Sequence, residues 1–136
     1  MWSPQHLTDS ILLSGTTAAT TARTANLDCS NAMHATIQVV ISAEANTNST
    51  NVVGQLLESD DTVASNFATF YSGHNNTIDN TAAAIRTYHV PLVGRKRYLR
   101  ISLTPDTTTN GAVIISATGH LLKNTTGATA SSASVG

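Results

Sequence analysis

The stretch MHATIQVVISA, residues 33–43, decides the fold class of this chain. Apolar side chains recur in it at every second position: Ala35, Ile37, Val39 and Ile41. Successive side chains of a β-strand point to opposite faces, so this spacing predicts a strand with one face in a core. The alternate positions, which begin at His34, are expected to be half-covered.

Further strands are predicted on both sides of this one, between polar turns. Their ranges are 9–15, 25–29, 52–59, 67–71, 83–90, 97–103 and 112–122. In 97–103 we expect Leu99, Ile101 and Leu103 to face inward. The last strand should bury one face as well, formed by Val113, Ile115, Ala117 and Leu121. These two strands are expected to form an antiparallel hairpin through a turn at Asn110-Gly111, because glycine adopts positive φ easily.

Composition agrees with an all-β chain. Only 11% of the 136 residues are charged, against about 25% in a typical globular protein, and Thr, Ser and Asn supply the missing polarity. The prediction is an antiparallel β-sandwich, jelly-roll-like, of about seven or eight strands with flexible arms at both ends. We divide the chain into an N-terminal arm (1–8), the sandwich domain (9–123) and a flexible tail of mostly Ser, Thr, Ala and Gly (124–136).

From the sequence we do not expect several classes of protein. No apolar run approaches the ~18–20 residues that cross a bilayer, so we expect no membrane partner. The first residues lack the pattern of a signal peptide. The lone Cys29 cannot form an intrachain disulfide or a Cys-based zinc site. A net charge of −1 argues against a nucleic-acid partner.

Nothing in the sequence predicts an enzyme, a metal or a cofactor. None of the five histidines has a second ligand at a metal-binding spacing. Three of them, His34, His89 and His120, fall on predicted strands and could converge, although ordinary strand positions explain them better. Asp60-Asp61 could be taken for a catalytic carboxylate pair. Adjacent strand residues point to opposite faces, however, and short acidic side chains favour turns, so we interpret this pair as a turn.

Two groups of residues are candidates for contacts with a partner. The first is the basic run Arg95-Lys96-Arg97 with Arg100, which could contact an acidic surface, although a solvated turn is the simpler interpretation. The second belongs to the N-terminal arm, where an exposed Trp would fit a partner's groove: Trp2, Pro4 and Leu7.

The order of several motifs resembles small virion proteins of tailed bacteriophages. An L-x-E-S-D-D strand end precedes a short aromatic strand, then Y-x-V-x-L-V-G-x-K-R-Y-L-R and G-A-V-I. The corresponding pieces here are 56–61, 67–71, 88–103 and 111–119, and the resemblance covers about residues 9–122.

The resemblance implies a capsid decoration (cement) protein with a β-sandwich fold. Such a chain would be made in the host cytoplasm, assemble as a homotrimer and bind the major capsid protein on the exterior of the expanded shell. Two alternatives stay open: a tail, neck or head-fibre subunit, and a glycan-binding module of the virion. For the last, Phe67 and Tyr71 share a strand face and could stack on a sugar.

Overall fold

The computed structural model describes residues 5–18, 21–43, 51–74, 83–105 and 113–124. This part of the chain contains eight strands and one short 3₁₀ helix, and none of it is a helix that could cross a membrane. The strands are β1 (Gln5–Ala18), β2 (Arg23–Asp28), β3 (Ala32–Ala43), β4 (Val52–Ser59), β5 (Ala68–His74), β6 (Ala84–Pro91), β7 (Tyr98–Pro105) and β8 (Val113–Asn124), and the 3₁₀ helix is η1 (Ala64–Asn66).

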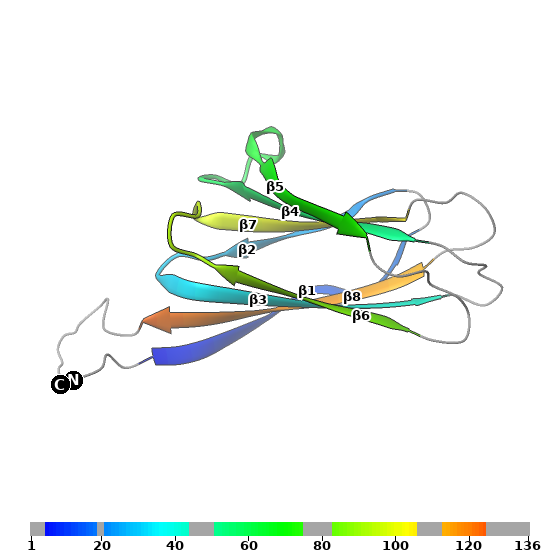
Figure 1. Cartoon of the computed structure of the whole chain (residues 1–136), viewed down its shortest axis with the longest axis horizontal. Helices are drawn as coiled ribbons and strands as arrows, with labels where there is room; N and C mark the ends of the chain where they lie inside the picture. The colour runs from blue at the N-terminus through cyan, green and yellow to red at the C-terminus, as the bar shows by residue number, and fades with distance from the viewer. Residues whose placement is uncertain (1–4, 19–20, 44–50, 75–82, 106–112, 125–136) are drawn as a thin grey trace.

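The strands form two four-stranded antiparallel sheets that lie face to face (Figure 1). Sheet A has the order β1-β8-β3-β6, and sheet B has the order β2-β7-β4-β5. The first strand therefore pairs with the last, β2 with β7, β3 with β6 and β4 with β5. This nested pairing is the topology of a jelly roll. The prediction of an all-β antiparallel sandwich is confirmed.

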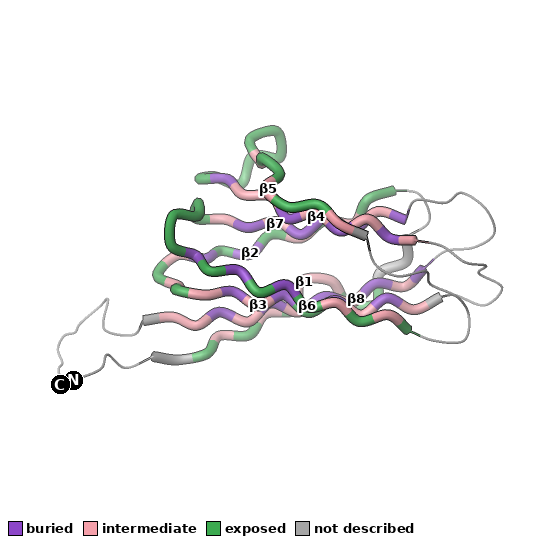
Figure 2. The backbone as a smooth tube through the Cα atoms, in the orientation of Figure 1, coloured by how far each residue is buried: buried purple, intermediate pink, exposed green. Residues whose placement is uncertain are grey.

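The core lies between the sheets and is formed by the alternating residues that the sequence predicts (Figure 2). In β3 the four apolar positions from Ala35 to Ile41 are completely buried, as are Leu99, Ile101 and Leu103 in β7. Burial of each valine, isoleucine or leucine among them stabilises the fold by about 1.5–3 kcal/mol. The inward face of β8 is buried as predicted.

The predicted hairpin between the last two strands is wrong. β7 lies in sheet B between β2 and β4, whereas β8 lies in sheet A between β1 and β3. Each of these strands therefore has both of its hydrogen-bonding edges occupied by other strands. Their similar alternation reflects a shared core, which they approach from opposite sheets. The expected turn at Asn110-Gly111 lies outside the described residues.

The first strand is longer than expected and shortens the predicted N-terminal arm of residues 1–8. β1 begins at Gln5, and its first residues pair with the end of β8, so that Gln5 lies opposite Asn124. Asn124, placed at the start of the tail, is likewise the last residue of β8. The backbone pairing of β1 with β8 therefore continues to both of these residues. Residues 1–4 and 125–136 lie outside the described residues.

A bulge in β1 changes which side chains reach the core. The pairing with β8 shifts between Ile11 and Leu13, so that Leu12 is the extra residue. A bulge places two residues opposite one and bends the strand. As a result Leu12 and Leu13 both pack against the core, whereas Ile11 is 77% exposed. The strand alternation of residues 9–15 would place Ile11 and Leu13 on one face, and the bulge separates them.

Candidate interaction surfaces

The residues predicted to contact a partner fall into two separate regions. In the N-terminal region, Trp2 and Pro4 lie outside the described residues. Leu7 lies in β1 opposite Leu122 and is 62% exposed. The basic run lies at one end of the sandwich, where the chain passes from β6 in sheet A to β7 in sheet B.

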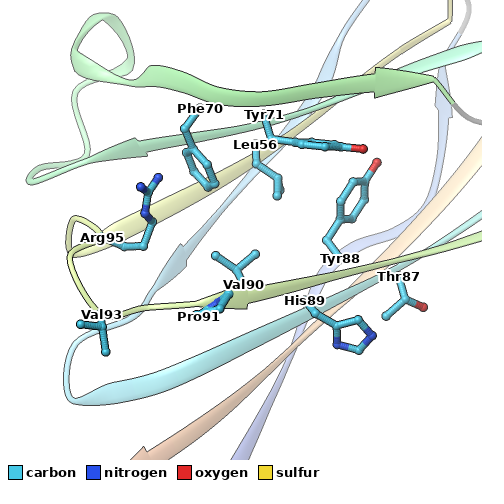
Figure 3. Close-up of a pocket in the computed structure, with 10 residues that line it drawn as sticks. All are labelled: Leu56, Phe70, Tyr71, Thr87, Tyr88, His89, Val90, Pro91, Val93 and Arg95. Atoms are coloured by element: carbon cyan, nitrogen blue, oxygen red, sulfur yellow. The ribbon is translucent and has the colours of Figure 1, made fainter.

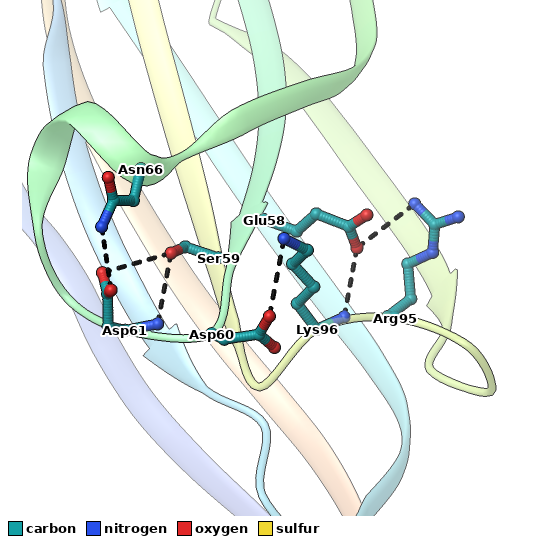
Figure 4. Close-up of polar contacts among 7 residues, drawn as sticks. All are labelled: Glu58, Ser59, Asp60, Asp61, Asn66, Arg95 and Lys96. Carbon is teal, nitrogen blue, oxygen red and sulfur yellow. Dashed lines mark hydrogen bonds and ion pairs between the residues drawn. The ribbon is translucent and has the colours of Figure 1, made fainter.

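Part of the basic run contacts acidic residues at the end of β4 (Figure 4). Nη1 of Arg95 lies 3.4 Å from Oε2 of Glu58, and the backbone N–H of Lys96 donates to the same oxygen at 3.2 Å. Nζ of Lys96 lies 3.5 Å from Oδ2 of Asp60. Glu58 lies opposite the fully buried Leu99 in the β4–β7 ladder of sheet B. Through Arg95 and Lys96 its carboxylate therefore binds the β6–β7 connection to sheet B.

The remaining two arginines are fixed on β2. Arg97 donates from Nε and Nη2 to the two carboxylate oxygens of Asp28, at 3.2 and 3.0 Å. This two-pronged hydrogen bond holds the pKa of Asp28 well below its usual range and raises the pKa of Arg97. Nε of Arg100 donates to Oδ1 of Asn26 at 2.7 Å.

Aromatic rings cover the same cations. The guanidinium carbon of Arg95 lies 4.5 Å from the ring centre of Phe70. The corresponding distance is 4.9 Å from Arg97 to Tyr98 and 3.9 Å from Arg100 to Phe67. These are cation–π distances, which favour the charged group at the ring face.

This end of the sandwich is therefore rich in charge without being a positive patch. Three of the four cations, Arg95, Lys96 and Arg97, each lie beside a carboxylate of the same chain. Their charges are compensated locally, and the cluster joins strands β2, β4 and β7 to the β6–β7 connection. Contact with an acidic partner stays a prediction, and this end of the sandwich has little net positive charge with which to attract such a partner.

The turn after β4 is organised by one carboxylate, which supports the interpretation of Asp60-Asp61 as a turn (Figure 4). Asp61 accepts hydrogen bonds from Nδ2 of Asn66 at 2.9 Å and from the backbone N–H of Val63 at 2.9 Å. Its own N–H donates to Oγ of Ser59 at 3.2 Å. The bonds from Asn66 and Val63 lower the pKa of Asp61.

The outer face of sheet A carries one polar row that runs across all four strands. Asp9 in β1 faces His120 in β8, and Thr36 in β3 faces both His120 and His89 in β6. Oδ1 of Asp9 lies 2.6 Å from Nδ1 of His120. The rings of His34 and His89 are 6.1 Å apart, so two of the three strand histidines are neighbours. Among the described residues no group of three His, Cys, Asp or Glu is placed to hold a metal.

Exposed apolar side chains flank this row on the same face. Alternate residues of a strand share a face, which places Leu7 and Ile11 on either side of Asp9 in β1. Ile85, at the other edge of the sheet in β6, is exposed as well. Exposed apolar residues on a strand face are typical of an interaction surface when they lie together.

A cleft of about 580 Å³ opens between β5 and β6, the edge strands of the two sheets (Figure 3). Its aromatic lining comes from Phe70 and Tyr71 in β5 and from Tyr88 in β6, with Arg95 and His89 as polar members. The rings of Tyr71 and Tyr88 meet edge to face, with their centres 5.9 Å apart. Tyr71 is exposed, whereas Tyr88 is buried. The cleft can therefore present ring faces and a few polar groups to a small ligand.

The sequence predicts no cleft, and of the polar row it indicates only that His34, His89 and His120 could converge. The cleft needs β5 and β6 on the same side of two different sheets, and the row needs the register of four strands. Spacing along the chain contains no signal for either. The pairs of Asp28 with Arg97 and of Asp9 with His120 join residues that are far apart in sequence, and they follow only from the nested strand order.

Comparison with known proteins by sequence gives no match to a family model and none to a curated protein. Comparison by structure does give matches. A structure of infectious bursal disease virus, Gx strain, superposes with a TM-score of 0.56 at 6% identity, and the VP2 subviral particle of that virus with 0.55 at 6% identity. Each covers 90% of this chain and 33% of the matched chain.

A third match is a protein of the disulfide-linked pili of Bacillus endospore appendages. Its TM-score is 0.49 at 10% identity, with 90% of this chain and 92% of that chain covered. This chain spans about a third of the length of the two viral chains. At these identities the likeness to the viral chains concerns the fold: a β-sandwich of the kind found in a virus particle.

Proposed function

We propose that this chain is a structural subunit of a virus particle and that it catalyses no reaction. The observation that carries the proposal is the jelly-roll strand order, which superposes on chains of a virus particle over 90% of this chain. The charge-poor composition supports it, because a subunit that sits among neighbours has less need of a charged surface.

We further propose that the particle is a tailed bacteriophage and that the chain decorates the exterior of its expanded capsid. The resemblance of the motifs from Leu56 to Gly119 to tailed-phage virion proteins supports this more specific role. A rigid sandwich that bridges neighbouring major capsid protein subunits would stabilise the expanded shell by mass action, because it binds that state and not the disassembled one. A homotrimer would add avidity through three linked contacts.

The surface proposed to contact the shell is the outer face of sheet A at its β1 edge, together with the N-terminal residues Trp2 and Pro4. Leu7 and Ile11 lie on this face and are largely exposed. The charge-rich end with Arg95, Arg97 and Arg100 is the less favoured contact, because its cations are already partnered.

The test uses expanded, DNA-free shells of the phage that encodes the chain. Purified chain is mixed with these shells and with unexpanded ones, and the fraction that sediments with each is measured. We expect binding to the expanded shells alone. Deletion of residues 1–4 leaves every described strand intact and is expected to weaken binding at least tenfold.

The control for this sedimentation test is a variant of the charge-rich end. The double variant Arg95→Gln/Lys96→Gln alters the charge-rich end and is expected to bind as the wild type does at every salt concentration. Equal sedimentation with both shells, or with neither, would contradict the decoration role. Rings or tubes of the chain alone in electron micrographs would favour a tail or neck subunit instead.

The cleft supports a glycan-binding role as a second candidate. Sugar rings pack their apolar faces on aromatic side chains, and Tyr71 presents an exposed ring beside Phe70 and Arg95. Binding to a glycan array that is lost on Tyr71→Ala and kept on Val63→Ala, an exposed residue outside the cleft, would support this role. An array without any signal for the wild-type chain would refute it.

A further inference from the structure

The free edge of β1 is the feature of the fold that the proposed function leaves unexplained. β1 is the outermost strand of sheet A and pairs only with β8 among the described strands (Figure 1). From Gln5 to Ile11 it pairs in an uninterrupted register, seven residues long, before the bulge. The outer edge of such a strand presents backbone N–H and C=O groups that can pair with another strand.

Two of the other three sheet edges are shorter or interrupted, and the third, β6, pairs over eight residues without a shift but contains Arg86. β6 ends in Pro91, which cannot donate a ladder hydrogen bond. The pairing of β5 is shifted by a bulge at Phe70, and β2 has only six residues, with Asp28 paired to Arg97 at its end. In contrast, residues 5–11 of β1 contain no proline, lysine or arginine, the residues that usually protect an edge.

The sequence of this edge is complementary to itself in the antiparallel direction. Leu7-Thr8-Asp9-Ser10-Ile11 has the same order of chemical types from either end: apolar, hydroxyl, acid, hydroxyl, apolar. We propose that β1 pairs with β1 of a second copy of this chain about a two-fold axis centred on Asp9, which joins two A sheets into one continuous sheet. Such a contact is isologous, because each copy contributes the same surface.

This register pairs the exposed side chains of the two copies favourably. Leu7 of one copy faces Ile11 of the other on the outer face, twice, and these residues are 62% and 77% exposed in the single chain. Thr8 faces Ser10 on the opposite face. The two copies of Asp9 face each other across the axis, and in each copy Oδ1 of Asp9 lies 2.6 Å from Nδ1 of its own His120.

Seven residues per copy bury less area than a stable interface requires, so the contact is expected to be weak between free copies. Copies held side by side on a particle would pair far more, because their effective concentration is high. The inference concerns only the contact between copies and does not depend on the proposed role in a virion.

Disulfide trapping tests both the contact and its register. In the proposed register position 9 faces itself, so Asp9→Cys alone is expected to form a cross-linked dimer under mild oxidation. Leu7→Cys alone is not expected to cross-link, because the two copies of position 7 lie four residues apart along the paired strands, a distance of about 13 Å. An equal mixture of Leu7→Cys and Ile11→Cys is expected to cross-link about half as fast as Asp9→Cys, because only half of the random pairs place position 7 of one copy opposite position 11 of the other. The native Cys29 is buried and does not interfere.

The control for random collision is Val93→Cys, which is 92% exposed on the β6–β7 connection. We expect Asp9→Cys to cross-link at least tenfold faster than this control. Equal rates for the two variants, or Leu7→Cys alone as fast as Asp9→Cys, would overturn the proposal. If Asp9→Cys does not fold, the mixture of Leu7→Cys and Ile11→Cys decides by the same comparison with Val93→Cys, at half the tenfold factor.

A second measurement uses no cysteine. Like charges that face each other across two strands oppose pairing, so Asp9→Asn is expected to strengthen self-association in sedimentation equilibrium by up to about fivefold. Ile11→Lys is expected to abolish it. Weaker association of Asp9→Asn than of the wild type would also overturn the proposed register.

Discussion

Gly54 in β4 allows a buried tyrosine to fit, and its replacement by alanine provides a quantitative test of the core. A Cβ atom at Gly54 would overlap Oη of Tyr88, which reaches across from β6 in the other sheet. The next atoms are Cζ of Tyr88 at 3.3 Å and Cδ2 of Leu103 at 3.5 Å, so the hydroxyl is the main obstacle. Tyr88 is only 6% exposed and cannot move outward freely.

The expected loss follows from these contacts. Forcing extra volume into a packed core costs typically 1–3 kcal/mol, and we expect about 2–3 kcal/mol for Gly54→Ala. At roughly 4 °C per kcal/mol for a chain of this size, the melting temperature should fall by about 8–12 °C. Tyr88→Phe alone should be neutral or stabilise by up to about 1 kcal/mol, because within the described residues the buried hydroxyl has no hydrogen-bond partner.

The double variant Gly54→Ala/Tyr88→Phe distinguishes this reasoning from a general intolerance of Gly54 to substitution. Removal of Oη should recover about 1–2 kcal/mol of the loss, measured by urea unfolding followed by circular dichroism. Gly119→Ala serves as the control, because its Cβ would meet Leu27 and Leu12 instead of Tyr88. Tyr88→Phe should give that variant no such recovery. Strictly additive effects for Gly54→Ala and Tyr88→Phe would refute the argument.

Three further predictions concern the core and the titrating groups. Ile37→Ala should lower the free energy of unfolding by about 2–5 kcal/mol, because Ile37 is fully buried in β3; a loss below about 1 kcal/mol in urea would contradict the packing. Burial raises the pKa of the Cys29 thiol from 9.0 to about 11, so its stabilising contribution is complete below pH 9 and lost as the pH rises through about 11. The wild type should therefore lose more stability between pH 8 and 11 than Cys29→Ala does, as urea unfolding at the two pH values would show. Asp28→Asn should lower the free energy of unfolding by less than about 1 kcal/mol at pH 7, because the pair with Arg97 is exposed. Since Arg97 lowers the pKa of Asp28 from 3.8, this difference in unfolding free energy from the wild type should shrink as the pH falls below about 4. A difference that persists in acid would show another cause.

The sequence predicts which residues are buried better than it predicts which strands are neighbours. Alternation in residues 33–43 and 97–103 identifies the inward side chains correctly, because burial on one face requires only the period of a strand. The same alternation says nothing of the partner strand, so the hairpin of the last two strands was predicted wrongly. One extra residue, Leu12, reverses the facing of Ile11, and a bulge of this kind has no signature in a run of apolar residues.

The candidate surfaces were predictable only in part. The basic run is visible in the sequence, but the acidic residues that compensate it come from β2 and from the end of β4. Asp28 and Arg97 are 69 positions apart in the chain, so no local pattern connects them. For the same reason the run has the sequence of a positive patch, whereas in the fold three of its four cations form ion pairs.

The pairing of β1 with β8 also determines when sheet A can be completed during synthesis of the chain. The innermost pair, β4 with β5, is close in sequence and can form early, whereas β1 must wait until β8 has left the ribosome. Chains dominated by such distant contacts fold slowly, in milliseconds to seconds. During that interval both edges of β1 are unpaired in the nascent chain, and unpaired strand edges make folding intermediates prone to aggregation.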